Sequence, residues 1–314
     1  MVNLYVVVPC YNEEEVLLET ARRLREKFLT LIEAEKISTE SRIVFVNDGS
    51  KDSTWKIIHE LHDKNKIFSG INLSRNRGHQ NALLAGLMTV KDFADVVISM
   101  DADLQDDINA VDEMIEKYAA GSDIVYGVRN KRETDTFFKR FTAECFYGFM
   151  ELLGANIVNN HADYRLMSRR ALNGLAEFEE VNLFLRGIVP MIGYPSAKVY
   201  YERAERFAGE SKYPLKKMLS FAFEGITSLT ISPIRAITRL GIIISLFSLI
   251  VLMWILYKYF TGAVIAGWSS TLTSLWFLGG LILLSVGIVG EYIGKIYLET
   301  KRRPRFIVSE FLNG

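Results

Sequence analysis

The chain has 314 residues, 49% of them hydrophobic, which is enough for a full-sized core and a second structural unit. Its 37 lysines and arginines balance its 37 aspartates and glutamates, so no general basic field for nucleic acid exists and we expect no nucleic-acid partner. Cys10 and Cys145 lack the spacing of a zinc site or a disulfide framework, which suits a reducing cytosolic compartment. The apolar run at residues 4–8 is too short for a signal peptide.

Short β-branched runs alternate with amphipathic helical patterns in the N-terminal part of the chain. The predicted strands cover residues 4–8, 42–46, 70–73, 95–100 and 123–127. Helices are predicted between them: one after a cap at Asn12, one around Trp55, one over residues 79–90 and one that contains Val111 and Met114. This alternation predicts an α/β fold with a mostly parallel sheet covered on both faces.

Two later segments, residues 240–257 and 272–290, contain no charged residue. Each forms a helix of about 27 Å, close to the hydrocarbon thickness of a bilayer, so we predict two transmembrane helices. A buried core hairpin is the alternative. Basic residues flank the pair on both outer sides, which by the positive-inside rule places both flanks in the cytoplasm; they are Arg235, Arg239, Lys295, Lys301, Arg302, Arg303 and Arg305.

Residues 137–153 and 215–231 are aromatic-rich and helical in period, with basic residues among the apolar ones. Either segment can lie in the membrane interface or face the core, and the second favours the interface because it leads into the first span. The expected organisation is a cytoplasmic domain at 1–214, an interfacial juxtamembrane helix at 215–235, two transmembrane helices at 236–298 and a cytoplasmic tail at 299–314. Gly290 and Gly294 have a small-xxx-small spacing that favours helix packing between subunits.

Polar residues follow each of the first four predicted strands. Because ligands bind at the carboxyl ends of parallel strands, these residues are expected to converge on one edge of the sheet. Each of them has a plainer interpretation as a helix cap or turn residue. The set is Pro9, Tyr11, Asn12 and Glu13 after the first strand, Asp48 after the second, Ser74, Arg75 and Asn76 after the third, and Asp101 and Asp103 after the fourth.

Asp101, Asp103 and Gln105 form the sharpest of these groups. Two carboxylates one residue apart at a strand end can hold a hard divalent cation such as Mg²⁺ or Mn²⁺ and leave positions open for a diphosphate. A lone pair of this kind is more often a solvated turn, and its position after a buried strand is what favours a metal site.

Five segments together resemble the family 2 glycosyltransferases with a GT-A fold: VVVPCYNEEE, VNDGSKDST, LSRNRGHQNALLAG, MDADLQDD and HADYRLMSR. More narrowly, the chain is similar to the polyprenyl-phosphate glycosyltransferases of the dolichyl-phosphate mannose synthase and bactoprenol glucosyltransferase type, over essentially its whole length. The resemblance implies a metal-dependent enzyme of the bacterial inner membrane, with its catalytic domain in the cytoplasm. It would transfer one sugar, glucose ahead of N-acetylglucosamine, from a UDP-sugar to undecaprenyl phosphate, for modification of a cell-envelope glycan. It also implies a homo-oligomer, with a tetramer expected.

The same resemblance implies roles for individual residues. Donor binding falls to Pro9, Tyr11, Glu13, Asp48, Arg75, Gln80 and Asp101, and the metal to Asp101, Asp103 and Gln105. Catalysis falls to Asp103, Arg129 and Asp163, the last beside the acceptor. The acceptor phosphate would be bound by Arg129, Arg165, Arg203, Arg206, Lys212 and Tyr213. A lipid phosphate is already anionic, so Asp163 is interpreted as an orienting group or an optional base, and attack from the opposite face would invert the anomeric centre.

Other classes of protein fit less well. A processive polysaccharide synthase would carry a Gln-x-x-Arg-Trp motif, which none of the four tryptophans completes. A dinucleotide dehydrogenase would need GxGxxG after the first strand, and a P-loop enzyme its glycine and lysine signature. A non-catalytic membrane scaffold with a decayed transferase domain is disfavoured by the intact acidic motif.

Overall fold

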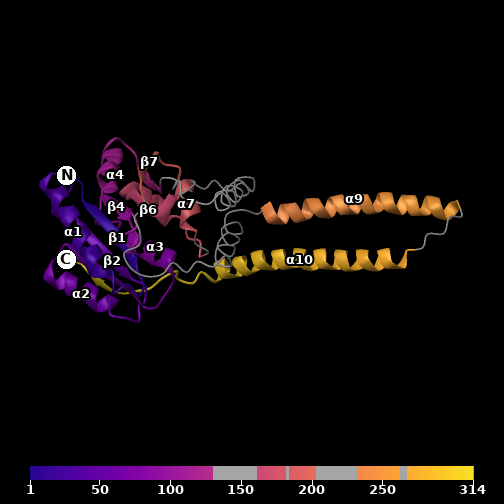
Figure 1. Ribbon diagram of the computed structural model, residues 1–314, viewed down its shortest axis with the longest axis horizontal. Coiled ribbons are helices and arrows are strands. Elements are labelled where there is room, and N and C mark those ends of the chain that lie inside the picture. Colours follow the sequence, from indigo (N-terminus) through magenta and orange to yellow (C-terminus); the bar gives the residue numbers. More distant parts are fainter. Residues whose placement is uncertain (130–160, 182–183, 203–231, 262–266, 314) are drawn as a thin grey trace.

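The computed structural model describes residues 1–129, 161–181, 184–202, 232–261 and 267–313 (Figure 1). Two predicted interfacial segments, 137–153 and 215–231, lie outside the described residues. So do four residues predicted to bind the acceptor phosphate, namely Arg203, Arg206, Lys212 and Tyr213.

An eight-stranded sheet forms the centre of the described structure, in the order β7-β5-β6-β4-β1-β2-β3-β8. β4, β1, β2 and β3 are mutually parallel, β5 and β7 are parallel to each other, and β6 and β8 run antiparallel to their neighbours. The predicted mostly parallel α/β sheet is therefore confirmed. The strands are β1 (Leu4–Cys10), β2 (Arg42–Asn47), β3 (Phe68–Leu73), β4 (Val96–Ser99), β5 (Ile124–Arg129), β6 (His161–Ser168), β7 (Ser196–Tyr201) and β8 (Val308–Leu312).

Helices cover both faces of this sheet, as its alternating residues require. Leu4, Val6 and Val8 of β1 join one apolar cluster with α1, α2 and α4, whereas Tyr5 and Val7 join a second with α3, α6 and α7. A strand buried on both faces reads as a continuous apolar run, which explains the central sequence of β1. The helices are α1 (Leu17–Glu33), α2 (Thr54–Lys64), α3 (His79–Val90), α4 (Ala110–Ala119), α6 (Arg169–Ala176) and α7 (Leu185–Met191).

α3 packs unusually close to the sheet at Gly86. A Cβ atom there would lie 2.4 Å from Cγ1 of Val7 and 2.8 Å from Cγ2 of Val46. A side chain at this position would push α3 away from β1 and β2. The close contact fixes the N-terminal end of α3, which carries His79 and Gln80, at the carboxyl edge of the sheet.

The C-terminal tail ends in a strand that the sequence patterns did not predict. β8 pairs antiparallel with β3, and the Ser74 amide donates to the Ile307 carbonyl at 3.0 Å. The Ser309 hydroxyl donates to the Asn72 carbonyl at 2.9 Å, and the ring of Phe311 lies 6.2 Å from that of Phe93. The tail is thus part of the α/β domain.

Two long helices, α9 (Ser232–Phe260) and α10 (Trp268–Lys301), run side by side away from the layered domain (Figure 1). Among the described residues, one segment is long and apolar enough to cross a membrane, Phe277–Lys301 of α10, and only 6% of its most apolar window is buried. The end of α10 contacts the domain, since the Val181 amide donates to Oε2 of Glu299 at 2.9 Å.

Candidate active site

The turns after β1 and β2 are tied together at the carboxyl edge of the sheet. Asn12, at a positive φ of 54°, accepts from the Lys51 amide at 2.9 Å and its own amide donates to the Ser50 hydroxyl at 3.0 Å. The Glu13 amide donates to Oγ1 of Thr54 at 2.9 Å. These bonds hold the polar ends of two strands as one surface. Tyr11, whose residue surface is 43% exposed, lies on it.

Asp48 is buried and holds the loop after β3. Its two carboxylate oxygens accept from the amides of Arg77 and Gly78 at 2.7 and 2.9 Å. Burial raises the pKa of the Asp48 carboxyl, and the two amide bonds oppose that rise. Gly49 follows with a positive φ of 63°, and a Cβ on it would lie 2.5 Å from the Asn76 nitrogen. Both Asp48 oxygens already accept hydrogen bonds from this loop, so a nucleotide that binds Asp48 would have to bind the same two oxygens.

Asp101 and Asp103 lie just beyond β4, as predicted. The Gln105 amide donates to Oδ1 of Asp103 at 3.2 Å, which closes a tight turn, and Leu104 within it has a positive φ of 58°. Burial raises the pKa of the Asp101 carboxyl to about 6, and the carboxylates of Asp106, Asp163 and Asp103 add to the rise. The crowding of like charges makes this edge of the sheet a site where a cation would be stabilised.

Asp163 of β6 lies between two arginines. Nη2 of Arg165 donates to its Oδ1 at 2.6 Å, and Nη2 of Arg186 donates to its Oδ2 at 3.1 Å. Burial alone would raise the pKa of the Asp163 carboxyl, but Arg186 and Arg165 outweigh it and lower the pKa well below its usual range. Asp163 is therefore a stable carboxylate and a very weak base.

His79, the first residue of α3, connects the two acidic motifs. Its Nε2 lies 3.4 Å from Oδ1 of Asp101 and 3.7 Å from Oδ2 of Asp163. The two aspartates are far apart in sequence but meet because β4 and β6 are adjacent, with Ser99 paired to Arg165. The Ser99 hydroxyl also donates to the Asp163 carbonyl.

Arg129, at the end of β5, is held by a buried tyrosine and a buried aspartate. Its Nε donates to the Tyr201 hydroxyl at 3.1 Å and its Nη2 to Oδ1 of Asp106 at 3.3 Å. The Tyr201 hydroxyl in turn donates to the same Asp106 oxygen at 2.5 Å. Asp106 Oδ2 is buried without a hydrogen-bond partner in the described part of the chain. The network holds the partly exposed guanidinium of Arg129 beside the loop after β4 that carries Asp101, Asp103 and Asp106, here called the acidic loop.

Two predicted binding residues have structural partners here. Oε1 of Gln80 accepts from the Leu185 amide at 2.9 Å, so Gln80 fixes the start of α7. The Arg165 side chain is only 2% exposed and is directed at Asp163. Its predicted contact with an acceptor phosphate would require it to leave this position. Pro9 lies within β1, and Arg75 is exposed on the loop after β3.

Three residues of this site were not singled out from the sequence: Asp106, Arg186 and Tyr201. Asp106 stands inside MDADLQDD, so the motif carried a signal for it. Arg186 and Tyr201 stand outside the five segments, in stretches whose local pattern is that of an ordinary helix or strand. The pairing of β5 with β7 sets Tyr201 opposite Arg129, and the bond from the Leu185 amide to Gln80 of α3 fixes the start of α7 where Arg186 reaches Asp163.

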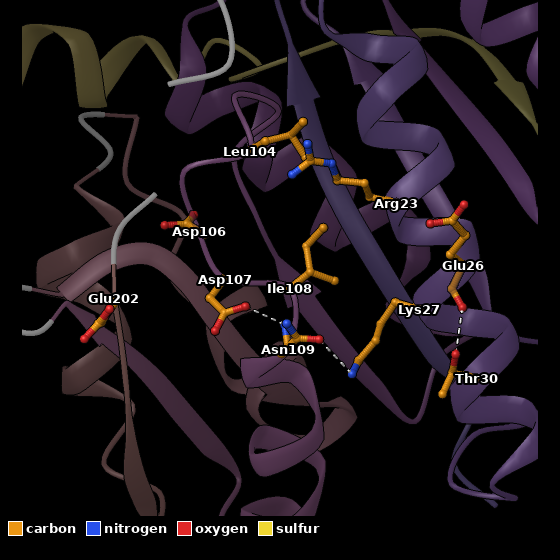
Figure 2. A pocket seen from close by; sticks show the side chains of 10 residues that line it. All are labelled: Arg23, Glu26, Lys27, Thr30, Leu104, Asp106, Asp107, Ile108, Asn109 and Glu202. Carbon is orange, nitrogen blue, oxygen red and sulfur yellow. Dashed lines mark hydrogen bonds between the residues drawn. The ribbon is translucent and has the colours of Figure 1, made fainter. Parts of the chain in front are cut away.

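A pocket of about 630 Å³ lies beside the acidic loop, between α1 and the residues that follow β4 (Figure 2). Asp106 lines it, together with Lys27, whose ammonium lies 3.4 Å from Oδ1 of Asn109. None of the residues predicted to bind the donor is among those lining it. The pocket is therefore lined by other residues than those predicted to bind the donor.

Among the residues that the structure describes, no group of three or more histidine, cysteine, aspartate or glutamate side chains is arranged to hold a metal ion. The acidic loop nevertheless supplies hard oxygen donors in a region of excess negative charge, with a raised pKa at Asp101. Two carboxylates and open positions suit Mg²⁺ or Mn²⁺ shared with a diphosphate. The donor set therefore fits such a cation.

The mostly parallel α/β sheet and the acidic motif after β4 agree with the comparison with known families. The chain matches the family described as glycosyl transferase family 2 over residues 5–175. It belongs to this family and is a glycosyltransferase.

The similar proteins extend the likeness to nearly the full length. The chain is 53% identical to glycosyltransferase YkoT of Bacillus subtilis strain 168, over 98% of this chain and 91% of that protein. It is 39% identical to the prophage bactoprenol glucosyl transferase homolog of Escherichia coli K12, with 97% of each chain covered. It is also 39% identical to the bactoprenol glucosyl transferase of Shigella phage SfII, with 98% of each covered.

Proposed function

We propose that this glycosyltransferase transfers one glucosyl residue from UDP-glucose to the phosphate of a polyprenyl lipid, undecaprenyl phosphate in a bacterium. The observation that carries the proposal is the arrangement around Asp163, where an acidic loop suited to a donor diphosphate faces a cluster of arginines. The relatives named bactoprenol glucosyl transferase, similar over nearly the whole chain, support both the sugar and the lipid. N-acetylglucosamine is the second candidate sugar.

The donor is proposed to bind along the ends of β1, β2 and β3. Tyr11 and Glu13 supply the surface for the nucleotide, and Arg75 lies on the neighbouring loop. Asp48 shapes this surface by holding that loop. Asp101, Asp103 and Gln105 would hold Mg²⁺ or Mn²⁺, which when bound neutralises the charge that develops on the leaving diphosphate.

The acceptor needs no strong base. A phosphate monoester is anionic near neutral pH, so its oxygen can attack the anomeric carbon directly while the bond to the UDP oxygen breaks. The lowered pKa of Asp163 supports an orienting role over proton abstraction. Arg129 is proposed to bind the attacking phosphate, and in-line attack would convert an α-linked donor into a β-linked product.

The enzyme is proposed to be anchored by two membrane spans, α9 and α10. β8 follows α10 and pairs with β3, which precedes α9, so these two strands would lie on the same side of the membrane. A crossing by α10 then calls for a second crossing, and residues 240–257 of α9 are free of charge. Exposed apolar side chains along both helices support burial in lipid; they include Ile243, Phe247, Ile250, Phe277, Leu283 and Leu284.

With basic flanks on both outer ends, the catalytic domain is proposed to face the cytoplasm. The homo-oligomer stays a prediction. Among the residues that the structure describes, none lies within 4 Å of a Cβ placed on Gly290 or Gly294, which supports this face of α10 as the contact with a second copy.

The proposal is tested with purified full-length protein, undecaprenyl phosphate, Mn²⁺ or Mg²⁺, and separate UDP- and GDP-sugars, with products read by mass spectrometry. We expect one lipid-phosphate hexose from UDP-glucose alone, loss of product with excess chelator and recovery on adding the cation back. Elongation of a sugar acceptor, or no transfer to the lipid with any donor, would exclude the proposed reaction.

A further inference from the structure

Asp163 is paired with two arginines that differ sharply in exposure. The side chain of Arg165 is 2% exposed, and that of Arg186 is 37% exposed. One carboxylate thus has a permanent, buried partner and a second partner that solvent can reach. If the second were engaged elsewhere, Asp163 would keep the 2.6 Å bond to Arg165 and its charge would stay compensated.

The backbone around Arg186 is fixed before any ligand arrives. The preceding Leu185 amide is bonded to Gln80 of α3, and Leu185, Ile188 and Val189 are buried in the core. Arg186 is therefore the residue of this first turn that extends toward the sheet edge. A long side chain on a fixed backbone loses little further freedom when it binds an anion.

The charged groups around Arg186 suit a position between the proposed donor diphosphate and the proposed acceptor phosphate. Besides Asp163, the charges of Asp101 and Arg129 also interact electrostatically with the Arg186 guanidinium. Asp101 belongs to the acidic loop after β4, whereas Arg129 and Asp163 belong to β5 and β6, on the other side of β4 from the proposed donor surface. Arg186 and Arg129 thus supply two cations away from the strands, β1 to β3, along which the donor is proposed to bind.

From this geometry we infer that Arg186 binds the acceptor phosphate, exchanging part of its contact with Asp163 for the phosphate oxygens, and that Gln80 positions it for this task. The inference rests on the proposed function. A guanidinium can contact two phosphate oxygens at once, and the fixed fork would also orient the third toward the anomeric carbon. In the absence of the acceptor, Asp163 would bind the Arg186 guanidinium and keep it in this orientation.

The test compares Arg186→Ala and Arg186→Lys with the wild type in full-length protein, titrating undecaprenyl phosphate and UDP-glucose separately. A matched control is Arg170→Lys, because Arg170 is also an exposed arginine paired with an aspartate, Asp123 at 3.4 Å, but outside the site. We expect the acceptor KM of Arg186→Ala to rise about ten- to a hundredfold. The donor KM should stay within about twofold in every variant.

Arg186→Lys keeps the positive charge but loses the planar guanidinium with its paired N–H donors, so its acceptor KM should also rise. Added guanidinium ion should partly restore Arg186→Ala and leave Arg170→Lys unchanged, a response that a merely structural role would not give. Unfolding temperatures of all variants are measured in parallel. If Arg186→Ala does not fold, the acceptor KM of Arg186→Lys decides the test.

Two results would overturn the inference while leaving the proposed function intact: an unchanged acceptor KM in both variants, or a rise confined to the donor KM. A wild-type protein that forms no lipid-linked sugar would overturn both.

Discussion

Asp163 holds a negative charge where burial opposes it, because Arg165 and Arg186 stabilise that charge from two sides. A carboxylate of this kind is costly to remove, since its loss leaves the buried Arg165 without a compensating charge. The same carboxylate oxygens would therefore serve both the stability of the fold and the proposed role of Asp163 near the acceptor.

We expect Asp163→Asn to lower the free energy of unfolding by about 3 kcal/mol at neutral pH and to reduce turnover strongly. Because folding lowers the pKa of Asp163, its stabilising contribution is complete above the unfolded pKa of about 3.9 and is lost as pH falls below it. The gap between wild type and variant, measured by denaturant unfolding, should therefore narrow below about pH 4. An equally large gap at pH 3 would contradict this account.

The Tyr201 hydroxyl joins Asp106 to Arg129. Tyr201→Phe should lower stability by about 1 kcal/mol and loosen Arg129, so that turnover falls several-fold with little change in donor KM. Tyr200→Phe is the matched control, because Tyr200 is the adjacent residue of β7 and is 61% exposed, against 3% for Tyr201. Steady-state kinetics and thermal unfolding of the two variants give the comparison, and equal effects would argue against the network.

At the scale of elements, β8 connects α10 to the proposed donor surface. It pairs with β3, and Ile307 just before it accepts from Ser74, the first residue of the loop that carries Arg75. α10 therefore leads directly into a strand that supports one wall of the proposed donor site.

Phe311→Ala should destabilise the domain by about 1 to 2 kcal/mol, since the ring is partly buried against Phe93. It should also raise the donor KM, because β3 and its following loop lose support. Glu310→Ala on the exposed side of the same strand serves as the control. Calorimetric unfolding together with UDP-glucose titration checks both effects, and a change in acceptor KM alone would show that β8 supports a different part of the site.

For the whole molecule, the pairing of β8 with β3 constrains the topology more strongly than hydropathy does. The two long helices lie side by side, and after α10 the chain returns to the same sheet (Figure 1). If α10 crosses the bilayer, we predict a second crossing as well.

Single cysteines report this topology in a background that lacks Cys10 and Cys145. Thr261→Cys, just after α9, should react with an impermeant maleimide in intact cells, whereas Ser309→Cys in β8 should react only after the membrane is opened. Labelling of both positions from the same side would rule out two spans.

By itself, the sequence determined the strands and helices of the N-terminal part, because β-branched runs and amphipathic periods are local properties. It also located Asp101, Asp103 and Asp163, whose segments resemble a known family. The tertiary structure alone decided what surrounds them. β6, β7 and β8 join the sheet through long-range pairing, which local patterns do not encode. That pairing sets Arg129 beside Tyr201 and the end of the chain beside β3, and the packing of α3 and α7 brings His79 and Arg186 to Asp163.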